Sequence, residues 1–120
     1  MAKLIVLITA QPDSARDIGV AWKNAGAPGV TFLDGFGLQS LRQAAGSLEI
    51  LSGTTSMLEI LRQTTTSVVL VLSVVENEEL VPRLMDVTQS IVGDMHQPDK
   101  GILFVLDVER ALGVSSRPGP

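Results

Sequence analysis

The feature that most constrains this fold is the order of its apolar segments, which repeats along the chain. In the first half, Leu4–Ile8 is a continuous β-favouring run, typical of a strand covered on both faces. Apolar residues at helical spacing follow, with Asp13 or Ser14 as the expected cap and Gly26 as a natural terminator. Val30–Leu33 then predicts a second, short strand. The first half therefore reads as β-α-β.

The second half repeats this order. Ser67–Val75 is the strongest strand signal in the sequence, and Ile102–Val108 is the last strand. Between them an apolar stripe runs from Leu80 to Ile91 and is closed by Gly93. Two β-α-β units predict an α+β protein with a ferredoxin-like βαββαβ sandwich, in which two helices cover one face of a four-stranded antiparallel sheet.

The predicted strands do not alternate between apolar and polar residues. Leu4–Ile8, Val68–Leu72 and Ile102–Leu106 are apolar at every position, and the mean hydropathy of the chain is +0.33. A sheet with helices on one face only would then expose a large apolar surface on its other face. Identical subunits are the expected cover. The alternative is a monomer whose middle segment folds over the sheet.

Composition removes several classes of function. The 120-residue chain has no cysteine and a net charge of −4, which gives no support to thiol chemistry or nucleic-acid binding. It has no Gly-x-Ser-x-Gly elbow and no Gly-x-x-x-x-Gly-Lys phosphate loop. The one histidine, His96, lies near Asp94 and Asp99, but a solvated loop is favoured over a metal site. We expect no enzyme and no resident metal. Because no apolar run is longer than that of Val68–Leu72, we also expect no membrane insertion and a cytoplasmic location.

A glycine-rich stretch and a long polar segment divide the two halves. Gly35-Phe36-Gly37 follows the second predicted strand, and glycines at such a junction can adopt positive φ and let a ligand approach the peptide N–H groups. Residues 38–66 are expected to be mobile. We expect one domain over residues 1–114 and a disordered tail at 115–120. Lys100 and Gly101 before the last strand could form part of an anion cradle.

These features resemble the nitrogen-regulatory P-II signalling family over roughly residues 3–112. The resemblance is based on the element order, the Gly-Phe-Gly-x-Gln stretch, the long segment after it and the turn before the last strand. It implies a homotrimer that binds an adenine nucleotide (ATP, ADP or AMP) in clefts between subunits. It also implies that the long loop of each subunit regulates a membrane transporter or a metabolic enzyme. The nucleotide-binding residues that it implies are Gly35, Phe36, Gly37, Leu38, Gln39, Lys100, Gly101 and Arg110.

The chain departs from the family pattern at three places. It has no tyrosine, so the modified tyrosine of many family loops is absent. Where the family has Gly-Asp-Gly-Lys before its last strand, this chain has Asp99-Lys100-Gly101-Ile102. The family's arginine pair after that strand is represented by Arg110 alone. A triphosphate would lose charge-assisted partners, each worth roughly 1.5–3 kcal/mol, which favours a mono- or diphosphate nucleotide or another small ligand.

Two alternatives remain open. The start of the chain, Val6–Pro12 with Ala15–Ile18 after it, is also similar to the CutA divalent-cation tolerance family, another ferredoxin-like trimer. The later CutA motifs are missing. The other alternative is a structural oligomer whose clefts bind no ligand. Nucleotide titration and copper or zinc binding would discriminate among the three.

Overall fold

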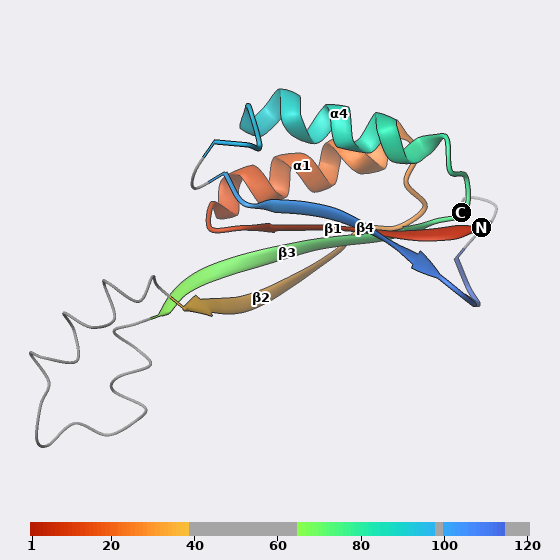
Figure 1. The fold of residues 1–120 in the computed structure, drawn as a ribbon, viewed down its shortest axis with the longest axis horizontal. Helices are drawn as coiled ribbons and strands as arrows, with labels where there is room; N and C mark the ends of the chain where they lie inside the picture. Colours follow the sequence, from red (N-terminus) through yellow and green to blue (C-terminus); the bar gives the residue numbers. More distant parts are fainter. Residues whose placement is uncertain (39–64, 98–99, 115–120) are drawn as a thin grey trace, which may run out of the picture.

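The computed structural model describes residues 1–38, 65–97 and 100–114. Six elements form one α+β sandwich (Figure 1). The segment expected to be mobile, residues 38–66, lies outside the described residues except at its ends, as does the tail at 115–120. The elements are β1 (Ala2–Thr9), α1 (Pro12–Ala25), β2 (Thr31–Leu38), β3 (Thr65–Val75), α4 (Leu80–Val92) and β4 (Ile102–Val108).

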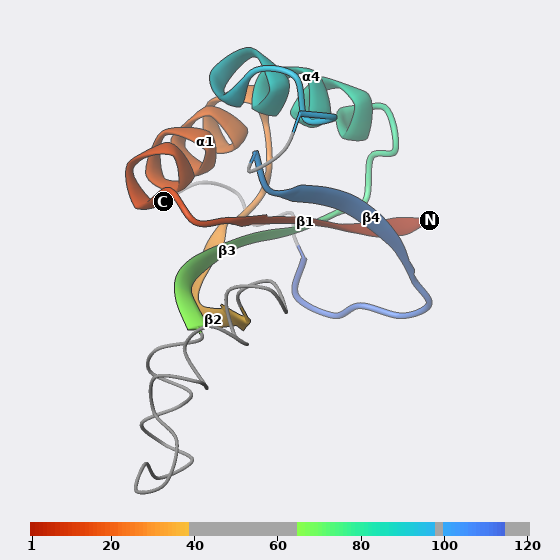
Figure 2. The same cartoon turned by 60° about the vertical axis from the view of Figure 1, so that its left-hand side comes forward.

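The four strands form one sheet in the order β2-β3-β1-β4, and all neighbouring strands are antiparallel. Both helices lie side by side on the same face of this sheet (Figures 1 and 2). The βαββαβ order and this strand arrangement confirm the predicted ferredoxin-like class. Strands β2 and β4 are the two edges of the sheet.

The helix-facing side of the sheet supplies the core. Ile5 and Leu7 of β1 are fully buried, as are Ile18 and Trp22 of α1 and Leu84 of α4. Successive residues of a strand point to opposite faces, so only alternate positions of each strand reach this core. The continuous apolar runs of the strands therefore place apolar side chains on both faces of the sheet.

The residues on the other side form what we call the open face. Cross-strand partners share a face, and Val6 pairs with Leu72 and Phe104, while Ile8 pairs with Leu70 and Ile102. No described helix covers this side. Leu33, Ile102 and Leu106 are 50%, 59% and 51% exposed. The open face comprises Leu4, Val6, Ile8, Leu33, Val68, Leu70, Leu72, Val74, Ile102, Phe104 and Leu106.

The helix starts differ in part from the prediction. The cap residue of α1 is Gln11 and Pro12 takes the first helical position, so the expected cap at Asp13 or Ser14 is wrong. Pro12 fixes φ at a helical value without losing a needed N–H, which sets the cap two residues before Asp13. Gly26, with φ +118°, ends α1 as predicted.

Candidate functional site

The Gly-Phe-Gly stretch lies inside a strand. β2 was expected to end at Leu33, but it continues to Leu38, and Gly35 and Gly37 pair with Val68 and Thr66 of β3. Neither glycine has a positive φ. The expected turn is therefore wrong, because β3 begins at Thr65 and provides an extended partner for the whole stretch.

Both glycines lie on the open face, and the single chain leaves room for a side chain at each. A Cβ at Gly35 would lie 3.4 Å from Val68 Cγ2 and 3.5 Å from Leu70 Cδ1. A Cβ at Gly37 would lie 3.6 Å from Val68 Cγ1. These are ordinary contact distances. Glycine weakens a strand, and in a strand it often marks the close approach of a ligand or of another backbone.

The side chains between these glycines lie on the other face of β2. Phe32 of this face packs against Gly19 of α1. Phe36 and Leu38 lie beyond that contact and are 76% and 75% exposed. Of the predicted nucleotide-binding residues, Phe36 and Leu38 thus lie on the face opposite the two glycines.

At Gly101 the backbone of the single chain itself requires glycine. Its φ is +99°, and a Cβ there would clash with the carbonyl oxygen of Ile8. The turn into β4 therefore requires glycine even without a ligand. The neighbouring Lys100 has its Nζ 3.8 Å from the position a Cβ of Gly93 would take, and it has no ion-pair partner among the described residues.

One chain does not bring these residues together. Gly35 lies on edge strand β2 and Lys100 precedes edge strand β4, with β3 and β1 between them. Three strand spacings of about 4.8 Å separate the two edges by about 14 Å. β4 is about 20 Å long, and Arg110 follows its far end, so Arg110 is farther than that from Ile102 along the chain. Gln39 lies outside the described residues.

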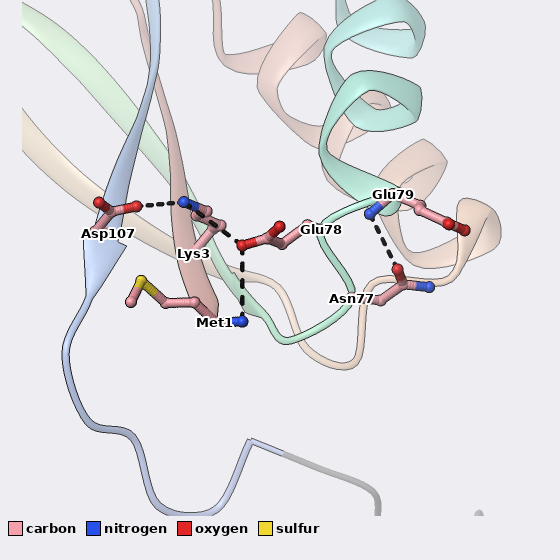
Figure 3. Close-up of polar contacts among 6 residues, drawn as sticks. All are labelled: Met1, Lys3, Asn77, Glu78, Glu79 and Asp107. Atoms are coloured by element: carbon pink, nitrogen blue, oxygen red, sulfur yellow. Dashed lines mark hydrogen bonds and ion pairs between the residues drawn. The ribbon is translucent and has the colours of Figure 1, made fainter.

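A charged cluster at the start of β1 was not predicted from the sequence. Lys3 Nζ donates to a carboxylate oxygen of Asp107 on β4 and lies 3.7 Å from Glu78 Oε1, which is 3.6 Å from the amino group of Met1 (Figure 3). The hydrogen bond to Asp107 is the main reason that the pKa of Lys3 is raised. The same bond lowers the pKa of Asp107. Residues 104 positions apart carry no sequence signal of this pairing, which the register of β1 and β4 creates.

The described residues offer little for a metal ion. Among residues 1–38, 65–97 and 100–114, no group of three or more histidine, cysteine, aspartate or glutamate side chains could hold one. The backbone N–H of His96 donates to Asp94 Oδ1 at 2.9 Å, and His96 is exposed. Asp99, the other residue considered with them, lies outside the described part. Within that part of the chain, no helix is long and apolar enough to cross a membrane.

Comparisons with known proteins find similarity in structure and not in sequence. No protein-family model matches the chain, and no curated protein sequence matches it. The periplasmic divalent cation tolerance protein CutA from Archaeoglobus fulgidus superposes with a TM-score of 0.59 at 11% identity, over 94% of this chain and 89% of that one.

Two proteins of the P-II type also match. GlnK of B. subtilis has a TM-score of 0.55 at 16% identity, over 90% of this chain and 85% of that one. The P-II protein of Arabidopsis thaliana, solved bound to citrate, has a TM-score of 0.59 at 17% identity, over 89% of this chain and 74% of that one. The likeness confirms the fold that the resemblance implied, and this fold is common to P-II proteins and CutA.

Proposed function

We propose that this chain is a divergent P-II-like regulatory protein that senses a small anionic ligand, an adenine nucleotide in the first instance, in clefts between identical subunits. It acts without catalysis, in the cytoplasm, and the segment between β2 and β3 engages a partner transporter or enzyme. The observation that carries this proposal is the pair of glycines in β2. The fold of one chain leaves room for a Cβ at Gly35 and Gly37, so their side-chain-free surface serves something outside the chain.

An assembly of identical subunits could bring together the site residues that lie apart within one chain. The open face gives identical subunits an apolar surface to bury, and a homotrimer is the assembly that the P-II resemblance implies. In such an assembly the β2 edge of one subunit can approach Lys100 or Arg110 of a neighbour, although the strand order keeps these residues apart within a chain. Lys100 would provide the positive charge for an anion, and the Gly35 and Gly37 backbone would allow close approach.

The ligand is expected to carry fewer phosphates than ATP. Lys100 precedes Gly101 here, and Arg110 stands alone where the family has two arginines. Fewer cations stabilise fewer phosphate charges. The similar Arabidopsis protein was solved with citrate, so a small carboxylate is also a ligand to test.

Calorimetric titration tests the proposal. ATP, ADP, AMP and citrate are titrated separately into the wild type and into Gly37→Ala, Gly37→Val and Lys100→Ala. We expect ADP or AMP to bind, Gly37→Val to abolish binding by its bulk, and Lys100→Ala to weaken binding in a way that depends on salt. Gly37→Ala is the control with a smaller added side chain, and it should weaken binding less than Gly37→Val does. The absence of nucleotide binding at millimolar concentration, or unchanged affinity in Gly37→Val and Lys100→Ala, would contradict the nucleotide site.

Partner regulation needs a separate measurement. A variant shortened within residues 39–64 should keep its oligomeric mass and its nucleotide affinity while losing its partner. The measurement is affinity capture from lysate of the source organism, with wild type and shortened variant compared. Equal capture of the same transporter or enzyme by both proteins would contradict a role for this segment.

A CutA-like cation-binding trimer is the second candidate, favoured by the likeness to the Archaeoglobus protein over 94% of this chain. Stoichiometric binding of copper or zinc, with no nucleotide bound, would support it. The absence of both metal and nucleotide binding in an intact oligomer would support a structural oligomer instead.

A further inference from the structure

Gly19 lies in the middle of α1, where a glycine destabilises the helix relative to alanine. It is buried and its φ is not positive, so the helix backbone does not require it. The reason for glycine is steric. A Cβ at Gly19 would lie 2.8 Å from Cε1 and 3.3 Å from Cε2 of Phe32, and closer still to Cζ. The glycine therefore makes room for the tip of the Phe32 ring.

This ring connects α1 to the edge strand β2. No residue of β2 is buried. On its helix-facing side Phe32 is 47% exposed, against 76% for Phe36 and 75% for Leu38. Phe32 pairs with Val71 of β3, which is fully buried. The ring thus ties β2 to the helix layer beside a buried position of the neighbouring strand.

The far end of β2 lies beyond this contact. Figure 1 shows β2 and β3 extending past α1 and α4. Gly35 and Gly37 follow Phe32 by three and five residues, or about 10 and 17 Å along the strand. The placement of these glycines therefore depends on the pairing with β3 and on how the ring seats β2 against α1.

We propose that Phe32 is a positioning residue: its ring, seated on Gly19, sets the placement of β2 and thereby of the Gly35 and Gly37 backbone. Phe32 lies on the face opposite the two glycines, so it acts through the strand and touches no ligand there. The effect on ligand affinity rests on the proposed function, whereas the effect on the strand does not.

Core packing alone does not account for the pair of Gly19 and Phe32. Because Phe32 is half exposed, its ring can move toward solvent when a methyl group is added at position 19. Alanine at that position would also favour the helix. The gain in helix propensity offsets the lost ring contact in the free energy of unfolding. The placement of β2 has no such compensation.

The test compares the intact wild type with Gly19→Ala, Phe32→Leu and the double variant. Asn24→Ala is the control, because Asn24 is exposed on α1 and its replacement favours the helix five residues away from Gly19. Hydrogen exchange without ligand should be about tenfold faster at the β2 amides that bond to β3 in both single variants, and unchanged at β1. The Tm of Gly19→Ala should stay within about 4 °C of the wild type. The effects should not add in the double variant, where the added Cβ meets no ring.

Titration of the same proteins with ADP and AMP connects the strand to the proposed ligand site. Affinity should fall severalfold in Gly19→Ala and stay at the wild-type value in Asn24→Ala. Unchanged exchange at β2 in Gly19→Ala would overturn the proposal, as would faster exchange with unchanged affinity. Equal acceleration in β1 and β2, with a lowered Tm, would show a purely structural contact and overturn it too. If the wild type binds neither nucleotide, the proposed function is wrong, while exchange at β2 still decides whether Phe32 positions the strand.

Discussion

At the scale of single residues, glycines near the proposed ligand site have two different origins. Gly101 has a positive φ and abuts the carbonyl oxygen of Ile8, so the fold requires it. Gly35 and Gly37 are extended, and a Cβ added to either would meet its neighbours at ordinary contact distance. A glycine that the subunit does not need is the better indicator of a ligand or a neighbouring chain.

Replacement by alanine should separate the two kinds of glycine. Gly101→Ala is expected to lower the free energy of unfolding by more than about 1 kcal/mol, because it adds backbone strain and a clash with Ile8. Gly37→Ala, the matched control, should change stability by less than about 0.5 kcal/mol. Urea unfolding followed by circular dichroism measures both. Similar losses in the two variants would show that Gly37 also has a structural role.

The Lys3–Asp107 pair predicts a dependence of stability on pH. The pKa of Asp107 is lowered from its ordinary 3.8 in the folded protein, so its contribution is present above that value and is lost as the pH falls through the folded pKa. The pKa of Lys3 is raised from 10.5, so its contribution is present below 10.5 and is lost as the pH rises through the folded pKa.

Asp107→Asn should therefore lower the Tm at neutral pH, and the gap to the wild type should close in acid, below about pH 4. Thermal melts from pH 2 to 8 measure the gap, with Glu109→Gln as an exposed control beside it. A gap that stays constant down to pH 2 would mean that the pair does not stabilise the fold.

At the scale of elements, one buried hydrogen bond joins the two helices. Trp22 Nε1 of α1 donates to Thr88 Oγ1 of α4 at 2.9 Å, and the Thr88 hydroxyl donates to the carbonyl oxygen of Leu84 at 2.8 Å. Trp22 and Thr88 are both fully buried. Their contact fixes α1 against α4 over the sheet.

Thr88→Val keeps the volume of the side chain but leaves the Trp22 N–H unsatisfied in the core. We expect a loss of about 1–3 kcal/mol in the free energy of unfolding, measured by urea titration. Ser90→Ala is the control on the same helix, because its hydroxyl is exposed and bonds to the carbonyl oxygen of Val87. A loss in Thr88→Val no larger than in Ser90→Ala would contradict the importance of this bond.

The sequence predicted the elements better than the site. Apolar runs and glycine terminators locate β1, α1, α4 and β4, because they record burial and local backbone preference. The second half of β2 was missed, since Asp34, Gly35 and Gly37 do not favour a strand and only pairing with β3 makes them one. Gly35 and Lys100 could be selected by resemblance, but their separation follows from strand order, which is a tertiary property.

At the scale of the whole molecule, the open face is the feature that a single chain leaves unexplained. Each of the four strands contributes at least one large apolar side chain to it, and Leu33, Ile102 and Leu106 are half exposed. A patch of this kind is unusual on a soluble monomer and common at interfaces between subunits. The other face is already covered by helices, so a charge there tests folding and not assembly.

Charge substitutions on the two faces should therefore have different effects. Leu106→Glu on the open face is expected to yield folded single chains, with unchanged far-ultraviolet circular dichroism. Val71→Asp, whose parent side chain is fully buried on the helix side, should unfold the protein. Size-exclusion chromatography with light scattering measures the mass of each variant. A Leu106→Glu protein with the mass of the wild-type assembly would argue against the open face as the interface.

The most direct test of the account is the mass of the wild-type protein in solution. The 12.7 kDa chain is expected to sediment as a stable assembly of three chains at micromolar concentration, because the open face needs identical subunits to bury it. Sedimentation equilibrium at several concentrations measures this mass without a partner or a ligand. A mass of three chains is the predicted result. A stable monomer at micromolar concentration would contradict the assembly, and with it the ligand clefts between subunits.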